Sequence, residues 1–184
     1  MKKLLVATAM LMLSACGSSS AANGNGASSP SPSASPSEQH IASVDACKLV
    51  TQAEASAATG KTLVNLQTMG MPVIPGACFY GAQNSSTGVF VYAQVYPDMQ
   101  TADAVTAEQF QVALAAQLGK GATSGKAVDG IGDKAFEFTG EGNAGDGVAI
   151  IVFKANVVFI IAVDPGTATP AENLARAAVG RLGA

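Results

Sequence analysis

The chain has 184 residues, of which 48% are hydrophobic and 12% are charged, and its formal net charge is −3. This length fits one domain together with export and linker segments. The acidic balance argues against nucleic acid as a partner, because such proteins cluster Lys and Arg against phosphates. With one histidine and three cysteines, the chain also lacks the residues that most metal sites and His-dependent catalytic triads need.

Residues 1–15 are predicted to be a lipoprotein signal peptide. Lys2 and Lys3 precede the apolar run Leu4 to Leu13, whose roughly ten residues are too few to span a bilayer, which needs about twenty. The following Leu13-Ser14-Ala15-Cys16 resembles the bacterial lipobox, in which small residues fit the signal peptidase and the cysteine thiol receives diacylglycerol. We therefore expect Cys16 to be lipidated. An ordinary secretory signal with a coincidental cysteine is the alternative.

Residues 16–40 are predicted to be the lipidated cysteine and a flexible tether rich in Ser, Pro and Gly, which lacks the apolar bulk needed to fold. His40 marks the boundary. Loss of the leader leaves 8 basic and 13 acidic side chains, a net charge of −5. Anionic headgroups repel such a body weakly, so we expect the anchor alone to hold the protein at the cell membrane, facing outside the cytoplasm.

The two remaining cysteines, Cys47 and Cys78, are expected to form a disulfide in this oxidising compartment. A loop of about 32 residues closed in this way restricts the unfolded chain by roughly 3.7 kcal/mol. A redox or metal-binding pair is the alternative, but the spacing lacks the C-x-x-C pattern that lowers a thiol pKa.

Three amphipathic helices are predicted. The first covers residues 51–60 and opens with a capping box from Thr51 to Glu54. The second begins at Thr106, or already after Thr101, and ends before Gly119. The third opens at Thr169 with Pro170 as its first helical residue.

Six further segments are rich in β-branched and aromatic residues and are bounded by Gly, Pro or Asn. Their short connections favour antiparallel pairing. We therefore predict an α+β domain over residues 41–184, with a meandering, mostly antiparallel sheet of about six strands and three helices packed on it. The strand segments are 61–69, 77–82, 88–96, 135–139, 147–153 and 157–163.

The strand at residues 88–96 is apolar on both of its faces, unlike a strand with one face in water. Helices or long loops that close both faces of the sheet would explain this. The functional alternative is that the sheet encloses an apolar ligand pocket or presents a surface patch to a partner. The candidate lining residues are Phe79, Phe90, Tyr92 and Tyr96.

No catalytic, metal-binding or cofactor-binding residue is predicted. A nucleophilic serine needs a positioned base, and no histidine follows His40. The glycine-rich segment 128–134 lacks the phosphate-loop pattern and precedes a strand, so it is predicted to be a turn or bulge. Carboxylate pairs such as Asp129 with Asp133 are expected to be solvated.

Three segments carry a family resemblance: residues 45–54 (DACKLVTQAE), residues 78–80 (CFY) and residues 128–135 (VDGIGDKA). They resemble the D-x-C-x-L-[LV]-T start, the second cysteine followed by an aromatic, and the V-x-G-[IL]-G-D-x-A turn of actinobacterial-type cell-envelope lipoproteins of unknown function. The similarity covers about residues 43–184. It implies an exported, lipid-anchored, disulfide-linked α+β domain and carries over no catalytic residue. The chain has no Trp, which departs mildly from that pattern.

The sequence therefore favours a membrane-tethered, extracytoplasmic binding module for an apolar small molecule or an envelope protein. A structural or accessory envelope lipoprotein without a small ligand is the alternative, and an enzyme ranks third.

Overall fold

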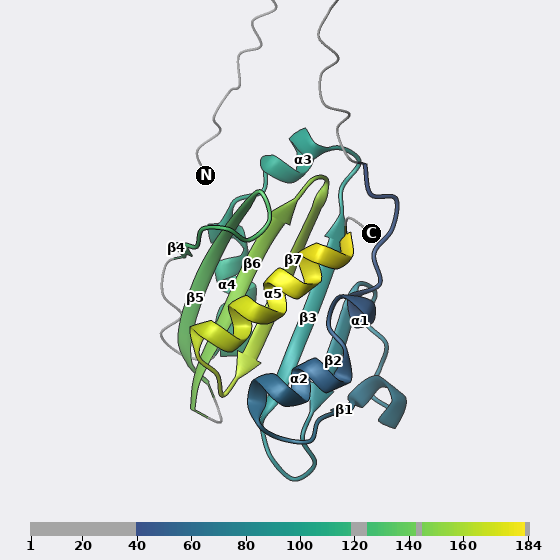
Figure 1. The fold of residues 1–184 in the computed structure, drawn as a ribbon, viewed down its shortest axis with the longest axis vertical. Coiled ribbons are helices and arrows are strands. Elements are labelled where there is room, and N and C mark those ends of the chain that lie inside the picture. The colour runs from purple at the N-terminus through teal and green to yellow at the C-terminus, as the bar shows by residue number, and fades with distance from the viewer. Residues whose placement is uncertain (1–39, 119–124, 143–144, 183–184) are drawn as a thin grey trace, which may run out of the picture. The chain divides into compact units, whose positions relative to one another are not determined.

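A seven-stranded sheet forms the centre of the fold (Figure 1). The structure, a computed structural model, describes residues 40–118, 125–142 and 145–182. The predicted signal peptide, Cys16 and almost all of the predicted tether lie outside the described residues. The strands are β1 (Val64–Asn65), β2 (Ala77–Gly81), β3 (Gly88–Val95), β4 (Lys126–Ala127), β5 (Lys134–Gly142), β6 (Gly145–Lys154) and β7 (Val157–Asp164).

All neighbouring strands pair antiparallel, in the order β1-β2-β3-β7-β6-β5-β4. Two meanders, β1-β2-β3 and β4-β5-β6-β7, meet where β3 pairs with β7. The predicted α+β class with an antiparallel meander is confirmed. The helices are α1 (Ala46–Leu49), α2 (Gln52–Thr59), α3 (Met99–Asp103), α4 (Ala107–Leu118) and α5 (Ala168–Leu182), and η1 (Leu66–Met69) is a 3-10 helix.

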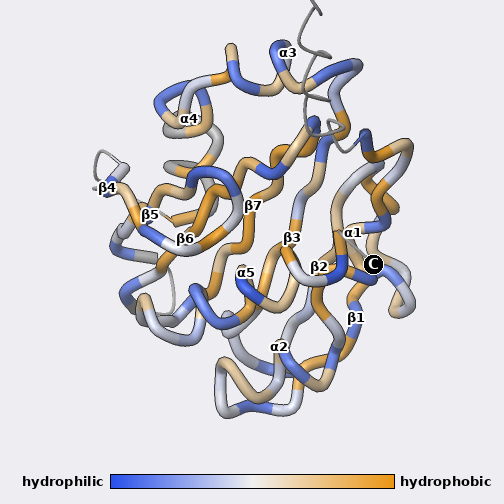
Figure 2. Tube along the Cα trace, turned by 45° about the horizontal axis from the view of Figure 1, so that its top comes forward, coloured by the Kyte–Doolittle hydropathy of each residue, from blue (hydrophilic) through white to orange (hydrophobic). Residues whose placement is uncertain are grey.

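Helices cover both faces of the sheet. Figure 1 shows α1, α2 and α5 in front of the strands and α4 behind them. Alternate residues of β3 illustrate the consequence, because Val89 and Val91 join the core under α1, α2 and α5 while Phe90 and Tyr92 pack against the core under α3 and α4. The hydropathy colouring shows the same burial as orange tube along much of β6 and β7 (Figure 2). Alternate residues of β6 and β7 likewise belong to the two cores, so helices that cover both faces of the sheet explain why these strands are apolar on both sides.

Local capping explains where several helices begin. The capping box at Thr51 and Glu54 is present, and Gly60, with φ 66°, ends α2 in the left-handed conformation. The side chain of Asp45 accepts a hydrogen bond from the Cys47 N–H and starts α1, a short helix that the sequence did not predict. Asp98 starts α3 in the same way.

Several elements differ from the predictions. The helix predicted from Thr106 is present as α4, but the alternative start after Thr101 is wrong, because the separate short helix α3 ends at Asp103 and α4 begins at Ala107. Strands β5 and β6 are longer than the predicted 135–139 and 147–153. The expected strand 61–69 shrinks to β1, because Asn65 caps η1 and Gly70 ends it at φ 95°. Helix α5 begins at Ala168, so Pro170 is not its first residue. The two-residue strand β4 was not predicted.

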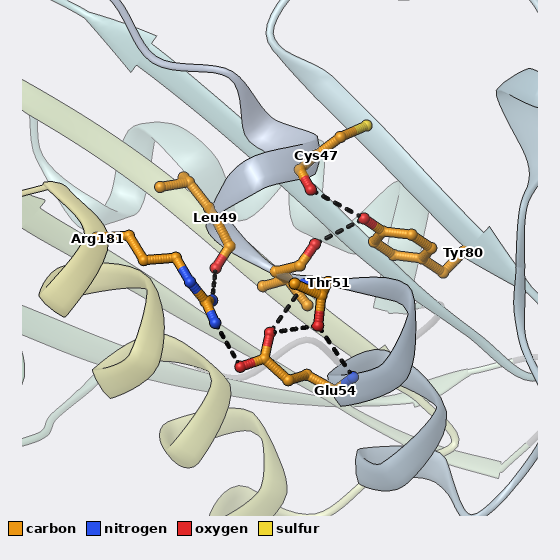
Figure 3. A network of polar contacts seen from close by, with 7 residues as sticks. Cys47, Leu49, Thr51, Glu54, Tyr80 and Arg181 are labelled. Carbon is orange, nitrogen blue, oxygen red and sulfur yellow. Dashed lines mark hydrogen bonds and ion pairs between the residues drawn. The ribbon is translucent and has the colours of Figure 1, made fainter.

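The last helix is joined to the first two by a polar network (Figure 3). The Arg181 guanidinium donates to the Leu49 carbonyl and to Glu54 Oε1, the latter at 2.6 Å. The Tyr80 hydroxyl, from β2, donates to the Val50 carbonyl at 2.6 Å. Burial first, and then the charges of Asp45 and Glu54, raise the pKa of Tyr80 above its ordinary value, so this hydroxyl remains a donor.

Within the described ranges, no helix has both the length and the apolar character needed to cross a bilayer.

Candidate functional site

The α4 side of the sheet is covered unevenly. Leu114 and Leu118 of α4 are buried, together with Phe138, Ile151 and the side chains around them. Over β2 and the first half of β3, Phe79 and Phe90 stay only half-buried. Helix α4 therefore leaves an aromatic part of this face open.

Strand pairing brings the open aromatic side chains together. Phe79 and Phe90 are directly opposite each other on β2 and β3, and their ring centroids are 4.8 Å apart. Tyr92 follows two residues after Phe90 on the same face, with its ring centroid 6.5 Å from that of Phe90. Offset or tilted aromatic pairs at such distances attract one another. We call Phe79, Phe90 and Tyr92 the aromatic row.

A groove of about 290 Å³ lies at one end of the aromatic row. Phe79 and Phe90 belong to its lining, with Leu66 of η1 and Leu118 of α4 among the other apolar side chains. The hairpin that joins β2 to β3 adds Ser85, Ser86 and Thr87, and β7 adds Ala162 and Asp164.

Two glycines give the groove its shape. A Cβ atom on Gly81 would lie 2.8 Å from Leu66 Cδ1, and one on Gly88 would lie 2.8 Å from the Tyr80 carbonyl oxygen. Both distances are shorter than a Cβ atom tolerates without a shift of its surroundings, although the flexible end of Leu66 can move more easily than the Tyr80 backbone. Gly81 therefore leaves room for Leu66, and Gly88 allows β3 to lie close to the β2 backbone.

Tyr96 lies apart from the groove lining, although it was predicted with the other three aromatics. Its backbone pairs with Asn156 at the other end of β3, where the Tyr96 N–H donates to the Asn156 carbonyl. Burial, and then the neighbouring Tyr92, raise the pKa of the Tyr96 hydroxyl. Of the four predicted residues, the structure places Phe79 and Phe90 at the groove, Tyr92 beside them in the row, and Tyr96 beyond it.

Charge is absent from the sequence around this site. No Asp, Glu, Lys or Arg occurs between Lys61 and Asp98, a stretch that includes η1, β2, β3 and the hairpin between the strands. Asp164 is the acidic residue of the lining. The groove can thus offer apolar area, ring faces and hydroxyl groups, but no basic side chain for an anionic ligand.

The other predicted features have structural roles. Cys47 and Cys78 form the disulfide, which is confirmed and joins α1 to β2. The segment 128–134 forms a turn before β5, as predicted, and Asp133 binds Lys154 Nζ at 2.8 Å and the Ala155 N–H at 2.7 Å. Burial acts to raise the pKa of Asp133, but these hydrogen bonds lower it below its ordinary value.

No group of three or more His, Cys, Asp or Glu side chains suited to a metal occurs in the part of the chain that the structure describes.

Sequence reasoning did not find Leu66, the hairpin hydroxyls or Leu118 as groove residues. Leu66 was placed in a predicted strand, and Leu118 was assigned to a helix whose position on the sheet was unknown. The uncharged stretch from Thr62 to Pro97 is the signal that points to β2, β3 and the segments beside them.

Comparison with known proteins finds no matching family model and no curated protein that the chain resembles.

Proposed function

We propose that the protein is a lipid-anchored, extracytoplasmic domain that binds an apolar small molecule in the groove beside Phe79 and Phe90. The observation that carries this proposal is the groove itself, which opens beside half-buried aromatic rings on the part of the sheet that α4 leaves uncovered. Aromatic side chains contribute large contact area with few rotatable bonds.

The size and chemistry of the groove support a small, uncharged ligand. Ligand pockets in proteins span about 300–1,000 Å³, so a groove of about 290 Å³ suits a single hydrocarbon chain or one or two rings. The hydroxyl groups of Ser86 and Thr87 lie at the hairpin end of the lining and suit a polar end group. Asp164 disfavours an anionic group at its end of the groove.

The anchor part of the proposal rests on the leader and on Leu13-Ser14-Ala15-Cys16. Metabolic labelling with palmitate tests it, since Cys16→Ser is expected to abolish the label. Unchanged labelling would contradict the lipoprotein interpretation and leave the groove proposal untouched.

Nile red, a neutral apolar fluorophore, tests the groove. We expect the wild-type chain to bind it and Phe79→Ser/Phe90→Ser to bind it at least about tenfold more weakly, because two ring surfaces are lost. Phe136→Ser is the matched control, because Phe136 is a half-buried aromatic on the same sheet face outside the groove lining. Circular dichroism verifies that each variant is folded.

Failure of the folded wild-type chain to bind Nile red would contradict the groove proposal. An equal loss of binding in the control variant would do the same. Native mass spectrometry of the exported protein identifies any ligand that co-purifies. Cross-linking to a single envelope complex, with no ligand bound, would instead favour the accessory lipoprotein.

A further inference from the structure

We propose that the loop Met69–Pro75, which begins with the last residue of η1 and leads to β2, is a lipid-contacting segment that dips into the membrane interface beside the anchor. Three large hydrophobic side chains in the described part of the chain are exposed, and all three belong to this loop: Met69 is 63% exposed, Val73 76% and Ile74 46%. Single exposed apolar side chains are common on protein surfaces, whereas a cluster of them marks a contact site.

The loop is held in place by its own backbone and by the strand that follows it. The Met71 N–H donates to the Leu66 carbonyl at 3.1 Å, and the Ala77 N–H donates to the Ile74 carbonyl at 3.0 Å. Gln67 Nε2 donates to the Ala77 carbonyl, and the next residue, Cys78, is linked to Cys47. The exposed side chains therefore project from a backbone that these hydrogen bonds and the disulfide hold in place.

The chemistry of the loop suits lipid rather than a protein partner. Residues 69–76 contain two methionines but no Trp, Tyr or Arg side chain, the types that dominate binding energy at protein interfaces. Pro72 and Pro75 carry no backbone N–H, which lowers the cost of moving the backbone into a less polar medium. An aliphatic loop needs no complementary surface in order to enter the acyl boundary.

The distribution of charge points to the same surface. The loop lies within the uncharged stretch from Thr62 to Pro97, so its approach to a bilayer desolvates no charged side chain of that stretch. The nearest acidic residue in the sequence after this stretch is Asp98. The aliphatic segment itself therefore adds no repulsion from anionic headgroups.

The position of the loop allows it to act together with the proposed anchor, on which this inference rests. Gly76 accepts a hydrogen bond from the Ala93 N–H, and three residues further along β3 the Tyr96 carbonyl accepts one from Asn156. Asn156 also binds Ile41, at the start of the described chain. The Gly76 end of the loop and the entry of the chain thus lie toward the same end of β3. The entry residue Ile41 follows Cys16 by 25 residues (41 − 16).

Tethering by the anchor makes a weak second contact effective, because the loop then meets the bilayer at high local concentration. The contact also fixes which side of the domain faces the lipid. Since Gly76 lies against the Tyr92 ring, the aromatic row begins close to the loop and leads toward the groove.

The test uses the exported, full mature chain bound to phosphatidylcholine vesicles that contain a small fraction of photoactivatable phosphatidylcholine. After irradiation, mass spectrometry locates the labelled residues. We expect the label to concentrate in residues 69–75. In Val73→Ser/Ile74→Ser the label should fall about tenfold, because most of the inserted aliphatic surface is gone.

The matched control is Ala57→Ser/Ala127→Ser, two exposed positions on α2 and β4, and it should keep the label in the loop. A chain that floats with the vesicles but is labelled evenly, or not at all in the loop, would overturn the inference and leave the anchor standing. A chain that does not float overturns both. Protein–protein cross-links in the loop in place of lipid label assign it to a second copy or a partner instead.

Discussion

Arg181, near the end of α5, donates a hydrogen bond from Nη2 to Glu54 Oε1 at 2.6 Å, across 127 positions of sequence (Figure 3). The same Glu54 accepts hydrogen bonds at Oε2 from the Thr51 N–H and hydroxyl. One carboxylate thus completes the cap of α2 and holds the last helix of the chain against the first two.

Acid should weaken this ion pair between α5 and α2. The hydrogen bond from Arg181 is the largest cause that lowers the pKa of Glu54 from 4.5 to about 2. A carboxyl with a depressed pKa contributes stability above its unfolded pKa, and this contribution is lost as the pH falls from about 4.5 to about 2. Because both side chains are about one-third exposed, screening leaves about 1–2 kcal/mol.

We therefore expect Glu54→Gln to lower the free energy of unfolding by about 1–2 kcal/mol at pH 7, and its difference from wild type to shrink toward zero near pH 2. Urea denaturation across this pH range measures it. Glu172→Gln, which breaks the ion pair of Glu172 with Arg176 within α5, is the control and should cost less than about 0.5 kcal/mol. A constant difference at every pH would contradict the assignment.

Asn156 fixes the entry of the chain into the domain. Its side chain is 2% exposed, accepts from the Ile41 N–H and donates to the Ile41 and Tyr96 carbonyls. Asn156→Ala leaves these groups without their partner and should cost about 2–3 kcal/mol. Thermal unfolding measures the loss, and limited proteolysis should cut before Val44 more readily. The exposed Asn173→Ala serves as the control.

The variant Asn156→Asp tests the same three hydrogen bonds by a change of charge. Aspartate keeps an acceptor for the Ile41 N–H but brings a negative charge toward two carbonyl oxygens. This variant should be less stable than Asn156→Ala at pH 7 and recover as the carboxyl is protonated on acidification. Equal stability of the two variants at pH 7 would argue against these hydrogen bonds.

Two glycines in the turn before β5 form a matched pair. Gly130 and Gly132 both have positive φ, 74° and 62°, but a Cβ on Gly132 would lie 2.6 Å from the Phe153 carbonyl oxygen whereas one on Gly130 meets nothing within 4 Å. Gly130→Ala should cost about 1 kcal/mol from backbone strain alone. Gly132→Ala should cost at least about 1 kcal/mol more in chemical denaturation. A smaller loss at Gly132 would contradict the packing.

The disulfide should account for a measurable share of stability. Cys47→Ala/Cys78→Ala releases a loop of about 32 residues in the unfolded chain and should lower the free energy of unfolding by up to about 3.7 kcal/mol. Urea titration of the oxidised wild type and the variant compares them. A thiol assay under denaturing conditions should find neither Cys47 nor Cys78 reactive in the exported wild-type protein, and two free thiols at these positions would contradict the bond.

Much of the fold was predictable because its signals are local. The capping box at Thr51 and Glu54, the strands β2, β3, β6 and β7, and the turn at 128–134 each follow from residues within a few positions of one another. The short elements were missed for the opposite reason. Helices α1 and α3 have four and five residues, too few for a periodic pattern to be detected.

The candidate site was only partly predictable. The alternation along β3 identified Phe90 and Tyr92 as members of one face, and Phe79 was predicted with them as an aromatic side chain. What the sequence could not give was the part of that face that stays open, because this depends on where α4 lies across the sheet. Tyr96 shares the pattern of the others, yet it lies beyond the row, at the end of β3 that Asn156 holds.

The sequence by itself determined the α+β class, the cysteine pair and the uncharged stretch from Thr62 to Pro97, since composition, spacing and periodicity are properties of neighbouring residues. Only the tertiary structure showed the groove, the exposure of the loop at Val73 and Ile74, and the ion pair between Arg181 and Glu54. These arise from contacts between segments distant along the chain, which form when the two meanders pair at β3 and β7 and the helices settle on opposite faces.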